Sequence, residues 1–183
     1  MELYLIRHPR PAVAPGICYG QTDLGLAESA VEVAARLRPL LPADFALYAS
    51  PLARARLLAE ALGTPRLEPR LKEIHFGEWE GRSYDDIGRA ALDAWADAPL
   101  DFAPPGGESP RQMAARVHDF LAELQAAPPA AAVVVAHGGP LRALAGHLLK
   151  LPAEYWLGLD FACGEVTRLD IHDWGTLLRW FNR

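Results

Sequence analysis

Lysine and cysteine are scarce in this chain of 183 residues, and long apolar runs are absent. Arginine supplies the basic side chains apart from Lys72 and Lys150. Cys18 and Cys163 stand far apart and form no metal-ligand pair, which favours a reducing compartment. No apolar segment is long enough to span a bilayer, and the first residues lack the basic start and cleavage site of a signal peptide. We therefore expect a cytoplasmic protein that has no membrane partner.

Excess positive charge is also missing. The formal net charge is -5, which argues against a nucleic-acid-binding surface. Hydrophobic residues make up 51% of the chain and charged residues 22%, as in ordinary globular proteins. No repeat or linker divides the sequence, and its length is enough for one sizeable core. We expect a single domain over residues 1–183.

Strands and helices alternate along the chain. Short apolar runs predict strands, and apolar residues recurring every three or four positions predict helices. Residues 132–136 are apolar throughout, which is typical of a parallel strand buried on both faces. The expected strands are residues 3–6, 45–49, 132–136, 165–172 and 176–181, the last two forming a hairpin, and the expected helices are residues 28–41, 51–62, about 84–95, 109–124 and 138–150. This order predicts an α/β fold, a three-layer α/β/α sandwich with a mostly parallel sheet.

Two serines mark expected helix starts. Ser50, followed by Pro51, is expected to cap the second helix. Ser109, with Gln112 three residues later, matches a capping box.

Polar residues follow three of the expected strands. Arg7 and His8 follow the first strand, Arg54 lies shortly after the second, and His137 and Gly138 follow the third. Ligands of open α/β sheets bind beyond the carboxyl ends of the strands, and helix N-termini at these junctions favour anions. Each residue taken alone is more simply a structural or solvated side chain. Their joint placement predicts one crevice.

Two arginines and two histidines in one crevice suit a phosphoryl group. Arginines can neutralise its oxygens, and a neutral imidazole can attack phosphorus. A proton must also reach the leaving alcohol, and Glu73, Glu78 and Glu80 are available for this step.

The sequence resembles the histidine phosphatase superfamily, whose fold is that of phosphoglycerate mutase. Five segments in the family's order, spanning nearly the whole chain, carry the resemblance. They are LIRH at residues 5–8, SPLARA at 50–55, LKEIHFGEWEG at 71–81, GES at 107–109 and VVAHGG at 134–139.

The resemblance implies roles for these residues. His8 would carry the phosphoryl group, while Arg7, Arg54 and His137 would complete the phosphate pocket together with Gly138. Glu73 matches the family's proton donor. The family needs no metal and no organic cofactor, and none is expected here. The same comparison leaves Glu78 and Glu80 as structural or rim residues and places Glu108 behind the site or at its rim.

One segment departs from the family's pattern. Pro9, Pro11 and Ala14 stand where the family has glycine, a hydroxyl residue and asparagine. Proline lacks a backbone N–H, so this wall loses polar contacts. Gln21 is a candidate replacement that would bind the phosphate.

The substrate is expected to be a small phosphorylated metabolite. The short, acidic chain favours hydrolysis over mutase chemistry. It most resembles short bacterial α-ribazole-5′-phosphate phosphatases of cobalamin assembly. A mutase-like or sugar-phosphate enzyme and a phosphohistidine protein phosphatase are the alternatives. A non-catalytic module is disfavoured because all five catalytic candidates are present.

Residues at about 74–108 are expected to form a lid insertion. Its aromatic residues, Trp79, Tyr84, Trp95 and Phe102, could stack on a substrate or form the lid's own core, and we favour the core. The sequence does not fix whether the protein is a monomer or a dimer.

Overall fold

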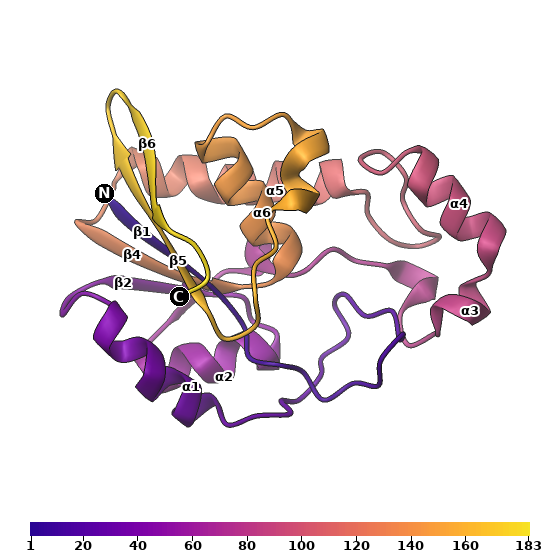
Figure 1. The fold of residues 1–183 in the computed structure, drawn as a ribbon, viewed down its shortest axis with the longest axis horizontal. Helices are drawn as coiled ribbons and strands as arrows, with labels where there is room; N and C mark the ends of the chain where they lie inside the picture. Colours follow the sequence, from indigo (N-terminus) through magenta and orange to yellow (C-terminus); the bar gives the residue numbers. More distant parts are fainter.

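The computed structural model describes residues 1–183 and contains one six-stranded sheet in the order β3-β2-β4-β1-β5-β6 (Figure 1). The strands are β1 (Glu2–Arg7), β2 (Ala46–Ala49), β3 (Arg66–Leu67), β4 (Ala131–Ala136), β5 (Val166–His172) and β6 (Gly175–Trp180). The first four in the sheet order are parallel, while β5 pairs antiparallel with β1 and β6 antiparallel with β5. The predicted terminal hairpin and mostly parallel sheet are confirmed.

Helices cover both faces of the sheet. Figure 1 shows α1 (Ala30–Leu37) and α2 (Ala53–Leu62) on one side, and α5 (Pro110–Ala126) and α6 (Gly138–Leu148) on the other. Alternate strand residues point to opposite faces. Accordingly, Tyr4 and Val133 join the core under α1 and α2, whereas Leu5 and Val134 join the core under α5 and α6. The expected three-layer sandwich is confirmed.

Several element boundaries differ from the prediction. The first helix begins at Ala30, capped by Ser29, and passes into a 3-10 turn, Arg38–Leu40, that contains Pro39. The region expected to hold one helix contains two, α3 (Tyr84–Ile87) and α4 (Arg89–Asp97), separated by Gly88 at φ +89°. Strand β3 is only two residues long and was not predicted. The remaining 3-10 turns are Pro69–Leu71, Gly77–Trp79 and Ala153–Gly158.

The two serine caps have different outcomes. Ser109 and Gln112 form the predicted capping box at the start of α5. The prediction for Ser50 was wrong, because α2 begins at Ala53 with Leu52 in the cap position. The Ser50 hydroxyl lies 2.8 Å from His137 Nε2 and accepts the N–H of Leu52 at 3.3 Å, so it caps no residue within α2.

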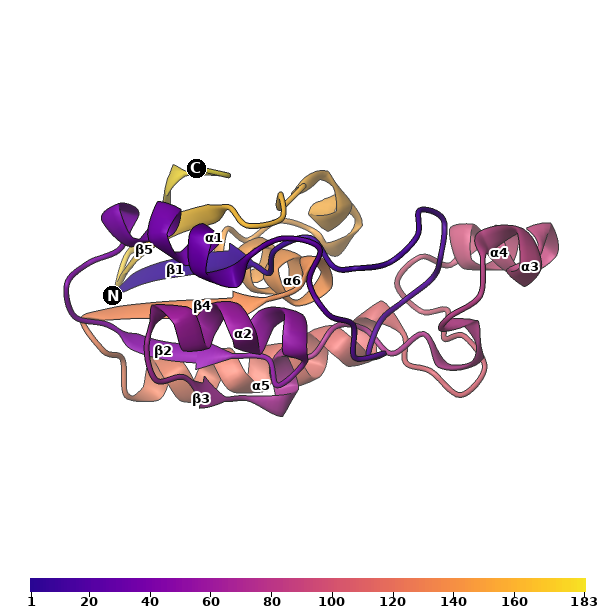
Figure 2. The ribbon, with the colours of Figure 1, turned by 90° about the horizontal axis from the view of Figure 1, so that it is seen from below.

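The segment with α3 and α4 lies at one end of the molecule, beyond the sheet (Figure 2). Trp79 packs there against Trp95 and Phe102 in a small separate core that also includes the buried Cys18. Burial raises the pKa of the Cys18 thiol to about 11. The predicted aromatic core is therefore present, although Tyr84 is 43% exposed and lies outside it.

No helix combines the length and the apolar character that crossing a bilayer would require.

Candidate active site

The carboxyl ends of β1, β2 and β4 bring the predicted residues together. These strands are neighbours in the sheet, so the residues that follow them meet at one edge. Arg7 ends β1, Arg54 lies in the first turn of α2, and His137 directly follows β4. The rings of His8 and His137 have centroids 5.0 Å apart. The convergence expected from the sequence is therefore present.

His8 is buried with a defined proton position. The residue is only 1% exposed, and its Nδ1 atom lies 2.6 Å from the carbonyl oxygen of Pro9. A carbonyl only accepts hydrogen bonds, so Nδ1 carries the proton and Nε2 keeps its lone pair. Burial, reinforced by the charges of Arg54 and Arg7, lowers the pKa of His8 to about 3. His8 is therefore a neutral imidazole at neutral pH, as a nucleophile must be.

His137 is fully buried and held by one hydroxyl. Ser50 Oγ lies 2.8 Å from Nε2, while Nδ1 has no partner within the protein. Burial lowers the pKa of His137 well below its usual value, and the nearby His8, Arg54 and Arg7 add to this effect. If Nε2 accepts from Ser50, the ring proton resides on Nδ1, which can then donate to a bound anion.

Arg7 and Arg54 are held by main-chain carbonyls rather than by carboxylates. Arg7 donates from Nη1 to Phe161 at 2.6 Å, and Arg54 donates to Thr22 at 2.9 Å and to Gly20 at 2.5 Å. Burial lowers the pKa of Arg54 from its usual value. A buried guanidinium without an anionic partner is costly. Both arginines are therefore arranged for a negative charge that comes from outside the protein.

Three buried side-chain polar atoms lack a hydrogen-bond partner, and all three belong to this site. They are Arg7 Nε, Arg54 Nε and His137 Nδ1. Buried polar atoms are normally satisfied, so a cluster of unpaired nitrogens needs a reason. Gly138 opens α6 beside them; a Cβ atom there would lie 3.7 Å from Arg7 Cζ. Its N–H belongs to the first turn, where backbone donors have no partner within the helix. This edge of the sheet is an anion site with two histidines.

Glu73 lies against the start of α6. Its two carboxylate oxygens are 3.2 and 3.3 Å from the Gly139 N–H, and the Ile74 N–H donates to Oε1 at 3.0 Å. A Cβ atom on Gly139 would meet Glu73 Oε1, so only glycine admits the carboxylate here. A carboxylate at a helix N-terminus has a structural role, because it stabilises the helix. Glu73 also lines a cavity beside the anion site, so its carboxylate can reach a bound molecule.

Gln21 contacts Glu73 rather than the two arginines. Its Nε2 donates to the Glu73 carbonyl at 3.1 Å, and its backbone N–H donates to Glu80. Glu80 also receives the N–H groups of Thr22 and Phe76. Its carboxylate thus shapes the loop whose carbonyls bind Arg54, a structural role of the kind expected for Glu80.

The cavity beside Glu73 has a volume of about 260 Å³. Its wall is mostly apolar and is completed by α4, by the start of α5 and by the turn Ala153–Gly158. Arg142 is the only cation on this wall, while Glu73 and Glu154 are its carboxylates. The lining residues are Glu73, Ile74, Phe76, Trp95, Pro99, Leu100, Pro110, Met113, Gly139, Arg142, Ala153, Glu154, Trp156 and Leu157.

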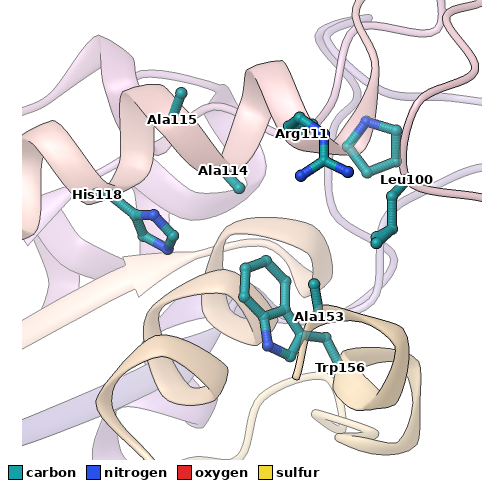
Figure 3. A pocket seen from close by; sticks show the side chains of 8 residues that line it. Leu100, Arg111, Ala114, Ala115, His118, Ala153 and Trp156 are labelled. Carbon is teal, nitrogen blue, oxygen red and sulfur yellow. The ribbon is translucent and has the colours of Figure 1, made fainter. Parts of the chain in front are cut away.

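A second cavity of about 220 Å³ adjoins the first between α5 and the turn Ala153–Gly158 (Figure 3). The two cavities share Leu100, Pro110, Ala153 and Trp156. Unlike the first cavity, the second one is lined by neither Glu73 nor Gly139. It is therefore separate from the anion site.

Sequence reasoning missed Arg142, Arg116, which donates to the Glu73 carbonyl at 3.0 Å, and the contact of the Ser50 hydroxyl with His137. Arg142 donates to the Leu159 carbonyl at 2.9 Å and lies on the cavity wall. All three act through contacts with residues distant in the chain, so no local pattern marks them. Only the position of Ser50 at a strand end was a usable signal.

A buried neutral histidine beside unpaired arginine nitrogens at the strand ends is suited to bind a phosphoryl group, and comparisons with known proteins point to the same class of enzyme. The model of the histidine phosphatase superfamily (branch 1) matches residues 3–183. The glucosyl-3-phosphoglycerate phosphatase of Mycobacterium tuberculosis is 35% identical over 183 residues, covering 86% of this chain and 79% of that protein. The adenosylcobalamin/alpha-ribazole phosphatase of Salmonella typhimurium is 32% identical over 190 residues, covering 91% of this chain and 94% of that protein.

Among solved structures, the alpha-ribazole phosphatase from Shigella flexneri matches with a TM-score of 0.90 and 29% identity, covering 100% of this chain and 96% of that one. This chain belongs to the histidine phosphatase superfamily. The predicted family, fold and class of phosphoric monoester hydrolase are confirmed by these matches.

Proposed function

We propose that this protein hydrolyses a small phosphomonoester through a phosphohistidine on His8, without a metal ion. The observation that carries the proposal is the neutral His8 beside three buried, unpaired nitrogens, Arg7 Nε, Arg54 Nε and His137 Nδ1. The positive charge of the two guanidinium groups attracts the phosphoryl oxygens and repels a metal cation.

In the first step, the His8 Nε2 lone pair attacks phosphorus and the bond from phosphorus to the leaving oxygen breaks. Glu73 gives its proton to that oxygen, so an alcohol departs. The phosphorylated ring keeps its proton on Nδ1, which donates a hydrogen bond to the Pro9 carbonyl. This hydrogen bond stabilises the new positive charge on the ring. The negative charge on the phosphoryl oxygens in the transition state is stabilised by Arg7, Arg54, His137 and the Gly138 N–H.

In the second step, water attacks phosphorus and the bond from phosphorus to Nε2 breaks. The water proton returns to the Glu73 carboxylate, and inorganic phosphate leaves. His8 is again neutral, so the cycle closes with one water consumed and no other reagent.

Hydrolysis of p-nitrophenyl phosphate with EDTA present tests this proposal. We expect the wild type to keep its full rate in EDTA and His8→Asn to lose on the order of 10⁴-fold or more in kcat. His172→Asn, which changes an exposed imidazole on β5, is the matched control and should behave as wild type. Equal rates for His8→Asn and wild type would overturn the phosphohistidine, and loss of wild-type activity in EDTA would overturn the metal-free chemistry.

Within this class we propose a leaving group that carries an aromatic ring, with α-ribazole 5′-phosphate as the first candidate. The support is the mostly apolar cavity beside Glu73, where Phe76, Trp95 and Trp156 offer ring faces or edges. The segment at about residues 74–108 would act as its lid, since Trp95, Pro99 and Leu100 form part of the wall.

The main alternative substrate is glucosyl-3-phosphoglycerate, the substrate in the name of the Mycobacterium tuberculosis relative. That molecule brings a carboxylate to a wall with two carboxylates and one arginine. We expect kcat/KM to be higher for α-ribazole 5′-phosphate than for glucosyl-3-phosphoglycerate, measured as phosphate release in parallel assays. The reverse order would overturn the aromatic assignment and leave the phosphohistidine chemistry standing.

Two other activities are less well supported. A mutase needs cations for a second phosphate, and Arg142 is the only one on the cavity wall. A phosphohistidine protein phosphatase must admit a protein segment, whereas α4 and the turn Ala153–Gly158 both contribute to this wall.

The location that we propose, the cytoplasm, accords with Cys18 and Cys163, which are free thiols.

A further inference from the structure

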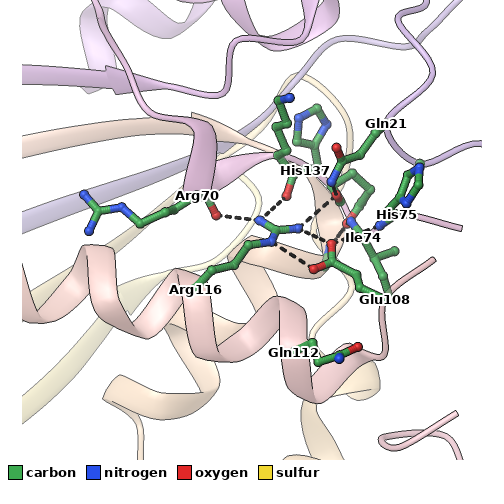
Figure 4. Close-up of polar contacts among 12 residues, drawn as sticks. Gln21, Arg70, Ile74, His75, Glu108, Gln112, Arg116 and His137 are labelled. Atoms are coloured by element: carbon green, nitrogen blue, oxygen red, sulfur yellow. Dashed lines mark hydrogen bonds and ion pairs between the residues drawn. The ribbon is translucent and has the colours of Figure 1, made fainter. Parts of the chain in front are cut away.

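Arg116 on α5 lies at the centre of a polar cluster (Figure 4) that includes the main-chain carbonyl of Glu73. Its Nη1 donates to the carbonyls of Arg70 at 2.6 Å and Lys72 at 2.8 Å. Its Nη2 donates to the carbonyl of Glu73 at 3.0 Å. One guanidinium thus binds three carbonyls within four consecutive residues, and the last of them belongs to the proposed proton donor.

Glu108 completes this cluster from the start of α5. It accepts from Arg116 Nη2 at 2.5 Å and from Nε at 3.1 Å, so the ion pair is bidentate. The same carboxylate accepts the His75 N–H at 3.0 Å. The ion pair therefore holds the chain on both sides of the Glu73 Cα, at the Lys72 carbonyl before it and at the Glu73 carbonyl and the His75 amide after it.

The backbone around Glu73 has no support from regular secondary structure. Between the 3-10 turns Pro69–Leu71 and Gly77–Trp79 the chain belongs to no helix or strand. Buried carbonyls in irregular backbone must find donors elsewhere, and here a fork of arginine donors supplies them. Arg116 and Glu108 are only about one-fifth exposed, at 21% and 19% of their side chains, so solvent screens this pair less than a surface pair.

We propose that Arg116, paired with Glu108, is a positioning residue that fixes the Glu73 carboxyl at the leaving oxygen. This inference rests on the proposed function, in which Glu73 donates the proton. Arg116 touches no reacting atom; it acts through the main chain of residues 70–75. Gln21, which donates to the same Glu73 carbonyl, adds a contact from the opposite loop.

Two substrates that differ in one nitro group distinguish this role from general support of the fold. The nitrophenolate of p-nitrophenyl phosphate leaves with little help from an acid, whereas the phenolate of phenyl phosphate needs protonation more. Arg116→Lys keeps the positive charge but loses the planar set of guanidinium N–H donors. We expect it to lower kcat/KM for phenyl phosphate by about 10²-fold. For p-nitrophenyl phosphate the loss should stay below about 10-fold.

Glu108→Gln is the second variant, because it weakens the ion pair and leaves every carbonyl contact of Arg116 possible. It should show the same selective loss, to a smaller extent. Arg111→Lys is the matched control: it lies on the same helix and pairs with the exposed Asp101, outside the Glu73 cluster. Arg111→Lys should leave both substrates unchanged.

Combination with Glu73→Gln makes the test decisive. If Arg116 acts through Glu73, adding Arg116→Lys to Glu73→Gln should cost no further activity on phenyl phosphate. Full additivity, or an equal loss on both substrates for Arg116→Lys alone, would overturn the inference while Glu73 keeps its role. If Glu73→Gln itself treats both substrates alike, the proton-donor assignment fails, and this inference fails with it.

Discussion

At the scale of single residues, His8 keeps its proton on Nδ1 because the Pro9 carbonyl can only accept. This contact explains how the chain tolerates proline after the nucleophile. Proline removes a backbone N–H, but the orientation of His8 needs only the carbonyl that every residue has. The departure from the family's pattern at Pro9 therefore leaves this orienting contact in place.

The buried histidine also predicts how stability depends on pH. The pKa of His8 is about 3 in the folded protein, because burial and then the charges of Arg54 and Arg7 disfavour the imidazolium. An unfolded histidine has a pKa of about 6.5. Between these values only the unfolded chain binds the proton, so the free energy of unfolding falls as pH decreases below about 6.5. The slope contributed by His8 approaches about 1.4 kcal/mol per pH unit.

Urea unfolding from pH 7 to pH 5 measures this slope above the range where most carboxylates titrate, whose usual pKa values lie near 4. His8→Asn should show a shallower dependence than wild type, whereas His172→Asn should not differ from wild type. Parallel curves for His8→Asn and wild type would contradict a neutral, buried His8.

At the scale of elements, three strand ends and two helix starts assemble the site. The strands around it were predictable because β1 and β4 are short apolar runs, a direct consequence of burial on both faces. The capping box before α5 was predictable because it is local. The start of α2 was not predictable, because Leu52 takes the cap position and the Ser50 hydroxyl contacts His137, which lies 87 positions away in the chain.

The same distinction holds for the site residues. His8, Arg54 and His137 could be placed together from the sequence, since each follows a strand of one sheet. Arg116 could not be recognised, because its partners are carbonyls of irregular backbone, which leave no side-chain pattern. Glu154 was also missed, since its place on the cavity wall depends on how the turn Ala153–Gly158 packs.

The turn Ala153–Gly158 predicts a change in specificity. Glu154 is exposed, forms no ion pair or hydrogen bond in the structure, and brings negative charge to the wall of the cavity beside Glu73. Glu154→Lys should raise kcat/KM for 3-phosphoglycerate relative to phenyl phosphate by about five-fold at low ionic strength. The gain should shrink with added salt, because the site is open to solvent.

Asp173→Lys is the control for this measurement, since it makes the same change in net charge on the exposed hairpin, away from the cavity. It should leave the ratio of the two substrates unchanged. Equal shifts for both variants would assign the effect to overall charge and remove Glu154 from the account of specificity.

At the scale of the whole molecule, a rigid sandwich holds the phosphoryl site and a projecting segment completes the cavity beside it. His8 and His137 follow strands of a sheet that four helices cover. Part of the wall of the cavity beside Glu73 belongs instead to α4, which packs on its own small core. We propose that this division separates the phosphoryl chemistry from the recognition of a particular substrate.

We propose that His8 carries the phosphoryl group during turnover. The enzyme is allowed to turn over ³²P-labelled substrate, the reaction is stopped rapidly without acid, and the labelled peptide is mapped. We expect label on the peptide that contains His8, stable to base and lost in acid as a phosphoramidate is, and absent from His8→Asn. Turnover without labelled enzyme, or label that persists in His8→Asn, would contradict the account.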